Sequence, residues 1–280
     1  MSEWARYART PNTVTGDLRV WPGLAGPGPE REREIYAWLP PQYAAHAADG
    51  RRYPVVYLHD GHALFDVHLH VATSGFDATD AAEWGVDETM TALHEEGLDA
   101  IVLGIPNSAE RRHIEYTPSC SFDPAVPAEA TAYVDWVADV VKPLVDSSFA
   151  TDPGREATVI GGSSLGGIVS LVGYRQRPEV FGAAGVFSPA FWYPGEPMLA
   201  ELETVPLPAG RIYLDIGGIE SPEVPGRPQR YEVDARRAAA ALEAQPQLDV
   251  RFVYEADGRH HERDWARRLP AAMRFLLSGQ

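Results

Sequence analysis

The stretch TVIGGSSLGGIVSL, residues 158–171, places two adjacent serines between pairs of glycines, after a β-prone run and before an apolar one. A strand that turns sharply into a helix around Gly-x-Ser-x-Gly can expose one serine hydroxyl at the tip of the turn. The residues two positions before and after that serine must be small, because strand and helix pack closely there. Gly162 and Gly166 meet this requirement for Ser164, whereas Ser163 has a leucine at the second position. The pattern therefore predicts that Ser164 is a nucleophile.

Two other interpretations of this segment are weaker. The glycines and serines could form an ordinary turn that joins a strand to a helix and has no chemical role. A phosphate-binding loop is also glycine-rich and also precedes a helix, but the Gly-Lys-Ser/Thr ending is absent from this segment, and so is the spacing G-x-G-x-x-G. The nucleophile interpretation is favoured because a histidine follows at a suitable later position.

Short β-prone runs alternate along the chain with segments of helical periodicity. The predicted strands are residues 35–39, 55–59, 100–105, 158–162, 183–187, 211–216 and 250–254, and the clearest predicted helices are residues 129–147, 231–244 and 264–277. Such alternation predicts an α/β protein with a mostly parallel central sheet and helices on both faces. Together with the serine turn, it predicts the α/β-hydrolase fold.

The proline- and glycine-rich stretch PGLAGPGPERE, residues 22–32, reads as a loop. We therefore divide the chain into an N-terminal segment and loop, residues 1–30, and one α/β-hydrolase domain, residues 31–280. The length of 280 residues is sufficient for one large domain with a substantial core.

Composition and charge restrict the partners of the chain. The formal net charge is −16, so the surface repels nucleic-acid phosphates and anionic lipids, and we expect neither as a partner. No apolar run approaches the roughly 20 residues that span a bilayer, and the N-terminus lacks the apolar region of a secretory signal. With Cys120 as the single cysteine, these features predict a cytoplasmic protein, and we keep a homodimer open as its assembly.

The base that would activate Ser164 is expected in a loop between the last strand and the last helix. A serine hydroxyl is a poor nucleophile until a base takes its proton, and a histidine base must be held by a third group. The segment VYEADGRHHERDWARRLPAAMRFLL, residues 253–277, fits this order, with Gly258 as a turn and His260 and His261 in the loop. Spacing alone leaves both histidines open, and His261 could instead face solvent or cap the helix.

The acid that would hold the histidine is expected after the strand at residues 211–216. Asp215 lies within that strand and could be a buried structural carboxylate. Glu220 lies beyond a glycine turn, in a loop at the carboxyl end of the strand, where triad acids are found. We favour Glu220, and we leave open Asp215, the more distant Glu223, and a dyad without an acid.

Backbone N–H groups should form the oxyanion hole. One donor is expected from Leu165, the residue after the nucleophile, and the other from the loop after an early strand. The strand at residues 55–59 is followed by Asp-Gly-His, and the glycine allows the backbone to approach a substrate closely. We take the N–H of His62 as the second donor, with that of Gly61 as the alternate.

Four histidines, His59, His62, His68 and His70, raise the question of a metal site. Their spacing matches no metal-binding motif. We therefore expect structural or surface histidines and no metal.

Six segments resemble one known family along nearly the whole chain from about Arg31. They are YLHDGHALFD, VLGIPNSAERRHIEYTP, IGGSSLGGIVSL, FGAAGVFSPAFWY, IYLDIGGIES and GRHHERDWARRLP, in this order. They are similar to the Putative esterase family of α/β-hydrolases, which includes enterochelin-esterase-like, feruloyl-esterase-like and S-formylglutathione-hydrolase-like enzymes. The resemblance implies an α/β-hydrolase fold and ester hydrolysis without a cofactor.

The resemblance also assigns site residues. The family's Gly-x-Ser-x-Gly serine corresponds to Ser164, its His-x-Glu-x-x-Trp histidine to His260, its acid after Gly-x-x to Glu220, and its oxyanion segment to residues 60–62. The chain departs from the family at His62, where glutamine is common, and at the residue after His260, where a small polar residue is usual. The first departure affects substrate contacts rather than the backbone donor, and the second keeps the choice of base slightly open.

The residues expected to bind the substrate lie within two of these segments. Phe191 and Trp192 come directly after a predicted strand, and with Tyr116 and Trp84 they could wall an acyl or aromatic pocket. Arg112 could bind a substrate carboxylate or phosphate. For any single aromatic residue, ordinary core packing is an equally good interpretation.

These observations predict a serine carboxylic-ester hydrolase that acts on a small-molecule ester through a Ser-His-acid triad and an acyl-enzyme. An acyltransferase with the same triad and a non-catalytic ligand-binding protein of the same fold are the alternatives. The sequence does not name the substrate.

Overall fold

The computed structural model describes residues 3–28, 32–74 and 82–278. Its central feature is a nine-stranded sheet with the strand order β1-β2-β3-β5-β4-β6-β7-β8-β9. The strands are β1 Ala5–Arg6, β2 Asp17–Ala25, β3 Glu32–Leu39, β4 Val55–His59, β5 Ile101–Ile105, β6 Thr158–Ser163, β7 Ala183–Phe187, β8 Gly210–Ile219 and β9 Leu248–Arg259. The first three strands pair antiparallel, β3 pairs antiparallel with β5, and all other neighbours pair parallel.

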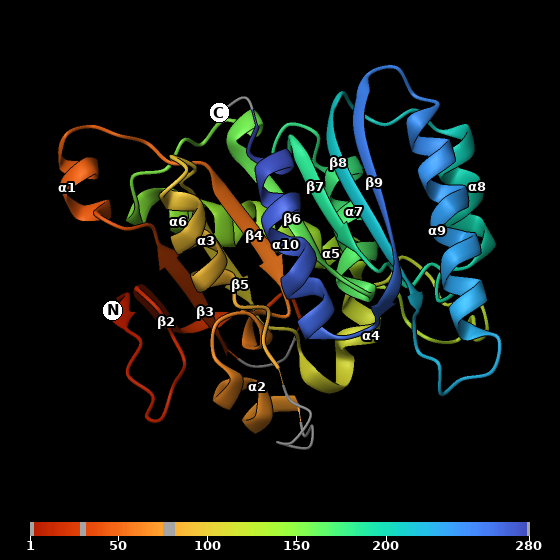
Figure 1. Cartoon of the computed structure of the whole chain (residues 1–280), viewed down its shortest axis with the longest axis horizontal. Helices are drawn as coiled ribbons and strands as arrows, with labels where there is room; N and C mark the ends of the chain where they lie inside the picture. Colours follow the sequence, from red (N-terminus) through yellow and green to blue (C-terminus); the bar gives the residue numbers. More distant parts are fainter. Residues whose placement is uncertain (1–2, 29–31, 75–81, 279–280) are drawn as a thin grey trace.

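Helices cover both faces of this sheet (Figure 1). The helices are α1 Tyr43–Ala48, α2 Val67–Ser74, α3 Val86–His94, α4 Arg112–Glu115, α5 Ala130–Trp136, α6 Lys142–Ser148, α7 Leu165–Gln176, α8 Glu196–Thr204, α9 Arg227–Glu243 and α10 Glu262–Leu276. Helices α3 and α10 lie over one face, and α5 and α7 lie behind the sheet on the other. The predicted α/β fold with a mostly parallel sheet is confirmed.

The central strands are buried on both faces, as their unbroken apolar runs predict. Successive residues of a strand point to opposite faces, so each strand contributes to two cores. In β4, Val56 packs into the core under α3 and α10, and Tyr57 packs into the core under α7. Both side chains are fully buried. These two cores fix the strand ends from which the site is built.

The N-terminal segment differs from the prediction. The structure places residues 22–25 within β2, so the prediction of a loop is wrong for these four residues. The reason is that β2 tolerates proline and glycine at an irregularity: its register with β3 shifts between Trp21 and Leu24. The predicted domain boundary at residues 30 and 31 lies outside the described residues.

The helix predicted at residues 129–147 is present, but its hydrogen bonding changes in the middle. A π-helical segment, η3 Val137–Val141, joins α5 to α6. Pro143 stands in the first turn of α6 and has no N–H to donate to the preceding turn. A local change of helical geometry accommodates that lost bond.

Strands β8 and β9 both extend beyond their predicted ends. Their last paired residues are Ile219 and Arg259. Glu220 and His260 are the next residues along each strand, so the pairing brings these two positions together.

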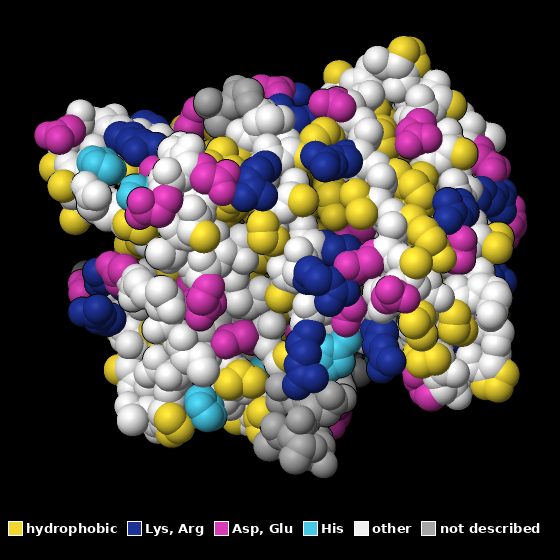
Figure 2. All heavy atoms as spheres, viewed as in Figure 1, with side chains coloured by type: hydrophobic (Ala, Val, Ile, Leu, Met, Phe, Trp, Pro, Cys, Tyr) yellow, Lys and Arg dark blue, Asp and Glu magenta, His cyan; other side chains and the backbone are white. Residues whose placement is uncertain are grey.

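On the face of the molecule shown in Figure 2, acidic and basic side chains are interspersed. Many form ion pairs, such as Arg274 with Glu96 and Arg267 with Glu255. Among the helices of the described residues, none combines the length and apolarity that crossing a membrane requires.

Candidate active site

Ser164 stands at the turn from β6 into α7, in a strained backbone conformation. Its φ is 58° and its ψ is −122°, which a non-glycine residue adopts only when its surroundings enforce it. A Cβ atom on Gly162 would lie 3.1 Å from the backbone of Gly166 and from the Cβ of His59. The close packing that requires small residues on both sides of the serine is therefore present.

His260 and Glu220 contact each other at the ends of β9 and β8. Nδ1 of His260 lies 2.7 Å from Oε2 of Glu220, whose side chain is fully buried. The other carboxylate oxygen accepts a hydrogen bond from the Oγ of Ser188 at 2.6 Å and another from the N–H of Gly217 at 2.7 Å. An imidazole held in this way at Nδ1 has Nε2 available for proton transfer.

Asp215, the alternative acid, has other partners. Its carboxylate accepts hydrogen bonds from Nε of Arg268 at 2.9 Å, from the N–H of Ser188 at 3.0 Å and from the hydroxyl of Tyr213 at 3.1 Å. Glu223, the third candidate, is exposed. Of the three carboxylates, the structure joins Glu220 to the histidine.

His261 caps helix α10. Its Nδ1 accepts a hydrogen bond from the N–H of Arg263 at 3.1 Å, and the residue occupies the N-cap position. The geometry therefore supports the helix-capping role considered for His261.

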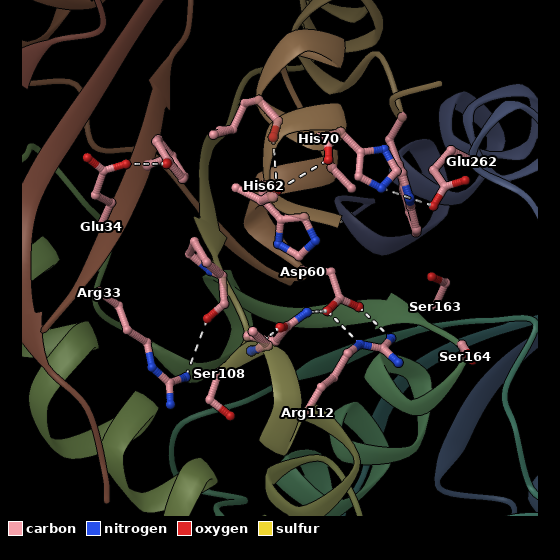
Figure 3. A pocket seen from close by; sticks show the side chains of 18 of the residues that line it. Arg33, Glu34, Asp60, His62, His70, Ser108, Arg112, Ser163, Ser164 and Glu262 are labelled. Atoms are coloured by element: carbon pink, nitrogen blue, oxygen red, sulfur yellow. Dashed lines mark hydrogen bonds and ion pairs between the residues drawn. The ribbon is translucent and has the colours of Figure 1, made fainter. Parts of the chain in front are cut away.

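Ser164 and His260 open onto one cavity of about 1030 Å³. Figure 3 shows Asp60, His62 and Arg112 grouped together, with Ser164 to one side of them. Trp84 also lines the cavity, as the sequence suggested. A space of this size accommodates a drug-sized or larger ligand.

The predicted oxyanion loop begins directly after β4. Gly61 packs against β5 so closely that a Cβ atom there would lie 2.6 Å from the backbone nitrogen of Ile105. His62 lines the cavity, and burial lowers the pKa of its imidazole, which keeps the ring neutral at neutral pH. Leu165 is the first residue of α7, directly after the serine.

Two predicted substrate-binding residues lie elsewhere. Phe191 and Tyr116 are fully buried, and neither lines the cavity, so the expectation that they wall a substrate pocket does not hold for this cavity. The ring of Tyr116 packs against those of His59 and Tyr133, which explains its burial as core packing.

The other two remain near the surface. Trp192 is partly buried, and the guanidinium of Arg227 lies 3.6 Å from the centre of its ring. Arg112 lines the cavity, where it forms an ion pair with Asp60 at 2.7 Å.

Sequence reasoning missed Tyr231, which touches both Ser164 and His260. Its ring centre lies 5.0 Å from that of His260, and the side chains of Tyr231 and Ser164 interact. Burial raises the pKa of Tyr231 to about 12, so its hydroxyl keeps its proton. The sequence shows this residue only as one apolar position of a helix, and no local pattern marks it as part of a site.

Of the four histidines considered for a metal, His62 and His70 are neighbours, with ring centres 5.7 Å apart. His59 is buried, with Nδ1 2.9 Å from the hydroxyl of Tyr133, and Nδ1 of His70 lies 2.6 Å from the carbonyl oxygen of Ala82. Within residues 3–28, 32–74 and 82–278, no three His, Cys, Asp or Glu side chains are arranged to hold a metal ion.

Comparisons with known proteins find esterases among the relatives of this chain. The siderophore triacetylfusarinine C esterase of Aspergillus fumigatus is 31% identical over 147 residues, which are 50% of this chain and 45% of the relative. The iron(III) salmochelin esterase of Escherichia coli is 28% identical over 197 residues, 64% of this chain and 42% of the relative. The chain thus spans less than half the length of these two curated relatives.

Solved structures confirm the fold. The siderophore hydrolase EstA from Aspergillus nidulans superposes with a TM-score of 0.69 at 18% identity, over 99% of this chain and all of the other. The sequence model of the family described as "Putative esterase" matches residues 27–276. The chain belongs to this esterase family, and it is an enzyme that acts on esters.

Proposed function

We propose that the protein is a serine carboxylic-ester hydrolase in which Ser164, His260 and Glu220 form the catalytic triad. The observation that carries the proposal is the hydrogen bond of 2.7 Å between the buried Glu220 carboxylate and His260, beside a strained serine that opens onto the same cavity. Ester hydrolysis by a triad needs these three groups in these roles.

The reaction proceeds in two halves. His260 takes the proton of the Ser164 hydroxyl as its oxygen attacks the ester carbonyl carbon, and the imidazolium then gives that proton to the leaving alcohol. Water attacks the resulting acyl-enzyme, with the same imidazole as base, and releases the carboxylic acid. The N–H groups of Leu165 and His62, with Gly61 as the alternate donor, stabilise the oxyanion of each tetrahedral intermediate.

The substrate class that we propose is a siderophore ester. The relatives named above are esterases of triacetylfusarinine C and of iron(III) salmochelin. The cavity of about 1030 Å³ supports a large, polar substrate, because arginine, glutamate, histidine and serine side chains line much of it. Trp192, outside that cavity, would contact a part of the substrate that extends beyond it.

The test compares two neighbouring serines. Ser164→Ala should lower kcat for p-nitrophenyl acetate and for a hydroxamate or catecholate siderophore ester by more than about 10⁴-fold, because no nucleophile remains. Ser163→Ala, the matched control, should stay within about tenfold of the wild type, since it leaves the nucleophile in place. Equal losses in both variants, or full activity in Ser164→Ala, would refute the proposal.

A further inference from the structure

Asp60, the first residue of the predicted oxyanion loop, has a backbone conformation that needs support. Its φ is 57° and its ψ is 43°, in the left-handed region. Aspartate visits this region more readily than most residues, but the conformation is still strained. The next residue, Gly61, is packed against the backbone of β5, so the conformation of Asp60 sets the path of the chain toward His62.

The Asp60 carboxylate is held by three hydrogen bonds. Arg112 donates from Nε to one oxygen at 2.8 Å and from Nη2 to the other at 2.7 Å. Nδ2 of Asn107 donates to the first oxygen at 2.6 Å. Figure 3 shows the guanidinium facing the carboxylate, beside the cavity. Such a two-pronged contact fixes the orientation of the carboxylate as well as its position.

The backbone of Asp60 is held from the same segment of the chain. Its N–H donates to the hydroxyl of Tyr116 at 3.3 Å, and the Arg112 guanidinium lies 5.3 Å from the centre of the Tyr116 ring. Tyr116 is itself fixed in the core. Residues 107–116 therefore contact Asp60 at both its side chain and its main chain.

Asp60 and Arg112 carry opposite charges and form an ion pair. Burial by itself would raise the pKa of Asp60, but the Arg112 guanidinium outweighs it and lowers this pKa to about 2. The carboxylate is thus charged at every pH at which the enzyme would work. Two of the three guanidinium nitrogens of Arg112 already donate to it, so its charge is largely neutralised before any substrate arrives.

We propose that Arg112 is a positioning residue: together with Asn107 and Tyr116, it locks Asp60 in the left-handed conformation and so aims the N–H of His62 at the oxyanion. This inference rests on the proposed function, and it assigns Arg112 a role other than direct binding of a substrate anion. Removing one oxyanion donor costs about 10²- to 10³-fold in kcat, and a loop shifted by about 1 Å costs a comparable factor.

A small neutral ester as substrate distinguishes the positioning role of Arg112 from direct binding of a substrate anion. On p-nitrophenyl acetate, which carries no anionic group, Arg112→Gln should lower kcat by about 10- to 100-fold and leave KM within about threefold. A residue that only binds a substrate anion would leave both constants unchanged. Arg274→Gln is the matched control: Arg274 forms the same two-pronged contact with Glu96, at 2.8 and 2.6 Å, far from the cavity.

A double-mutant cycle tests whether Arg112 acts through Asp60. Asp60→Asn keeps a side chain that tolerates the left-handed region but removes the charge. If the two residues work as a unit, the double variant loses no more kcat than the more damaging single variant. Losses that multiply would overturn the proposal, and so would a wild-type kcat in Arg112→Gln.

Arg112→Lys covers the case in which Arg112→Gln does not fold. Lysine keeps the charge but cannot contact both carboxylate oxygens with a rigid fork, so kcat should still fall about tenfold. A wild-type kcat in this variant would then count against the proposal. The proposed function itself would fail in a different way: the wild type would not turn over esters, or turnover would survive in Ser164→Ala. If the wild type turns over esters and Arg112→Gln does so equally well, only the positioning role is refuted.

Discussion

Two buried carboxylates, one within β8 and one directly after it, have different partners. Asp215 lies within the strand and is held by Arg268, a side chain that is itself buried and keeps its charge. Glu220 lies directly after the strand and is held by His260, whose side chain is 18% exposed and lines the cavity. Both carboxylates are 0% exposed, so burial does not tell them apart.

The difference teaches that the partner decides what a buried carboxylate does. A guanidinium cannot give up its proton in a protein, so Arg268 holds Asp215 in place and does not act as an acid or a base. An imidazole gains and loses a proton near neutral pH, so the pair of Glu220 and His260 can take part in a reaction. Ser188 touches both carboxylates: its N–H donates to Asp215 and its Oγ donates to Glu220, which links the structural pair to the proposed catalytic pair.

The largest expected effect follows from removing the catalytic carboxylate. Glu220→Ala should lower kcat/KM for p-nitrophenyl acetate by about 10³- to 10⁴-fold, because the imidazole loses the group that orients it and stabilises its cation. Steady-state kinetics measures this effect. Glu223→Gln, an exposed carboxylate three residues further along, is the matched control and should behave as the wild type. A Glu220→Ala enzyme within tenfold of the wild type would remove the distinction between the two carboxylates.

The second effect concerns stability rather than rate. Asp215→Ala leaves Arg268, the Ser188 N–H and the Tyr213 hydroxyl without their shared acceptor, and we expect it to lower the free energy of unfolding by about 3 kcal/mol. Urea unfolding followed by tryptophan fluorescence measures this change. The folded fraction should retain far more activity than Glu220→Ala does. An Asp215→Ala variant that is as stable as the wild type but inactive would reverse the two roles.

The smallest effect concerns the residue that the two pairs share. Ser188→Ala removes one of the two hydrogen bonds to Oε1 of Glu220, and the N–H of Gly217 still donates to that oxygen. One hydrogen bond to a charged group contributes about 1.5 to 3 kcal/mol, so kcat should fall about 10- to 100-fold with little change in KM. An unchanged kcat would mean that the structural pair does not support the catalytic one.

Much of this arrangement could be predicted from local sequence. The turn around Ser164 is specified within five residues, because close packing leaves little room for a side chain at either flanking position, Gly162 or Gly166. The positions of His260 and Glu220 follow from the order of strands, since neighbouring parallel strands end at one edge of the sheet.

The rest depends on contacts between distant segments. The pairing of Arg112 with Asp60 spans 52 residues, and nothing near either residue indicates it. Tyr231 reaches Ser164 from a helix. The apolar periodicity of that helix already accounts for a tyrosine at this position, so the sequence gives no sign of a role in the site. Phe191 and Tyr116 do not line this cavity as predicted, because an aromatic residue next to a loop can face either the core or the cavity, and only packing decides which.

The central claim is that the hydroxyl of Ser164 becomes covalently bonded to the acyl group. The direct measurement is mass spectrometry of the protein after reaction with a fluorophosphonate, followed by mapping of the modified peptide. We predict one adduct per chain, on Ser164, absent from Ser164→Ala and much slower to form in Glu220→Ala. An adduct on any other residue, or equal labelling of wild type and Ser164→Ala, would contradict the account.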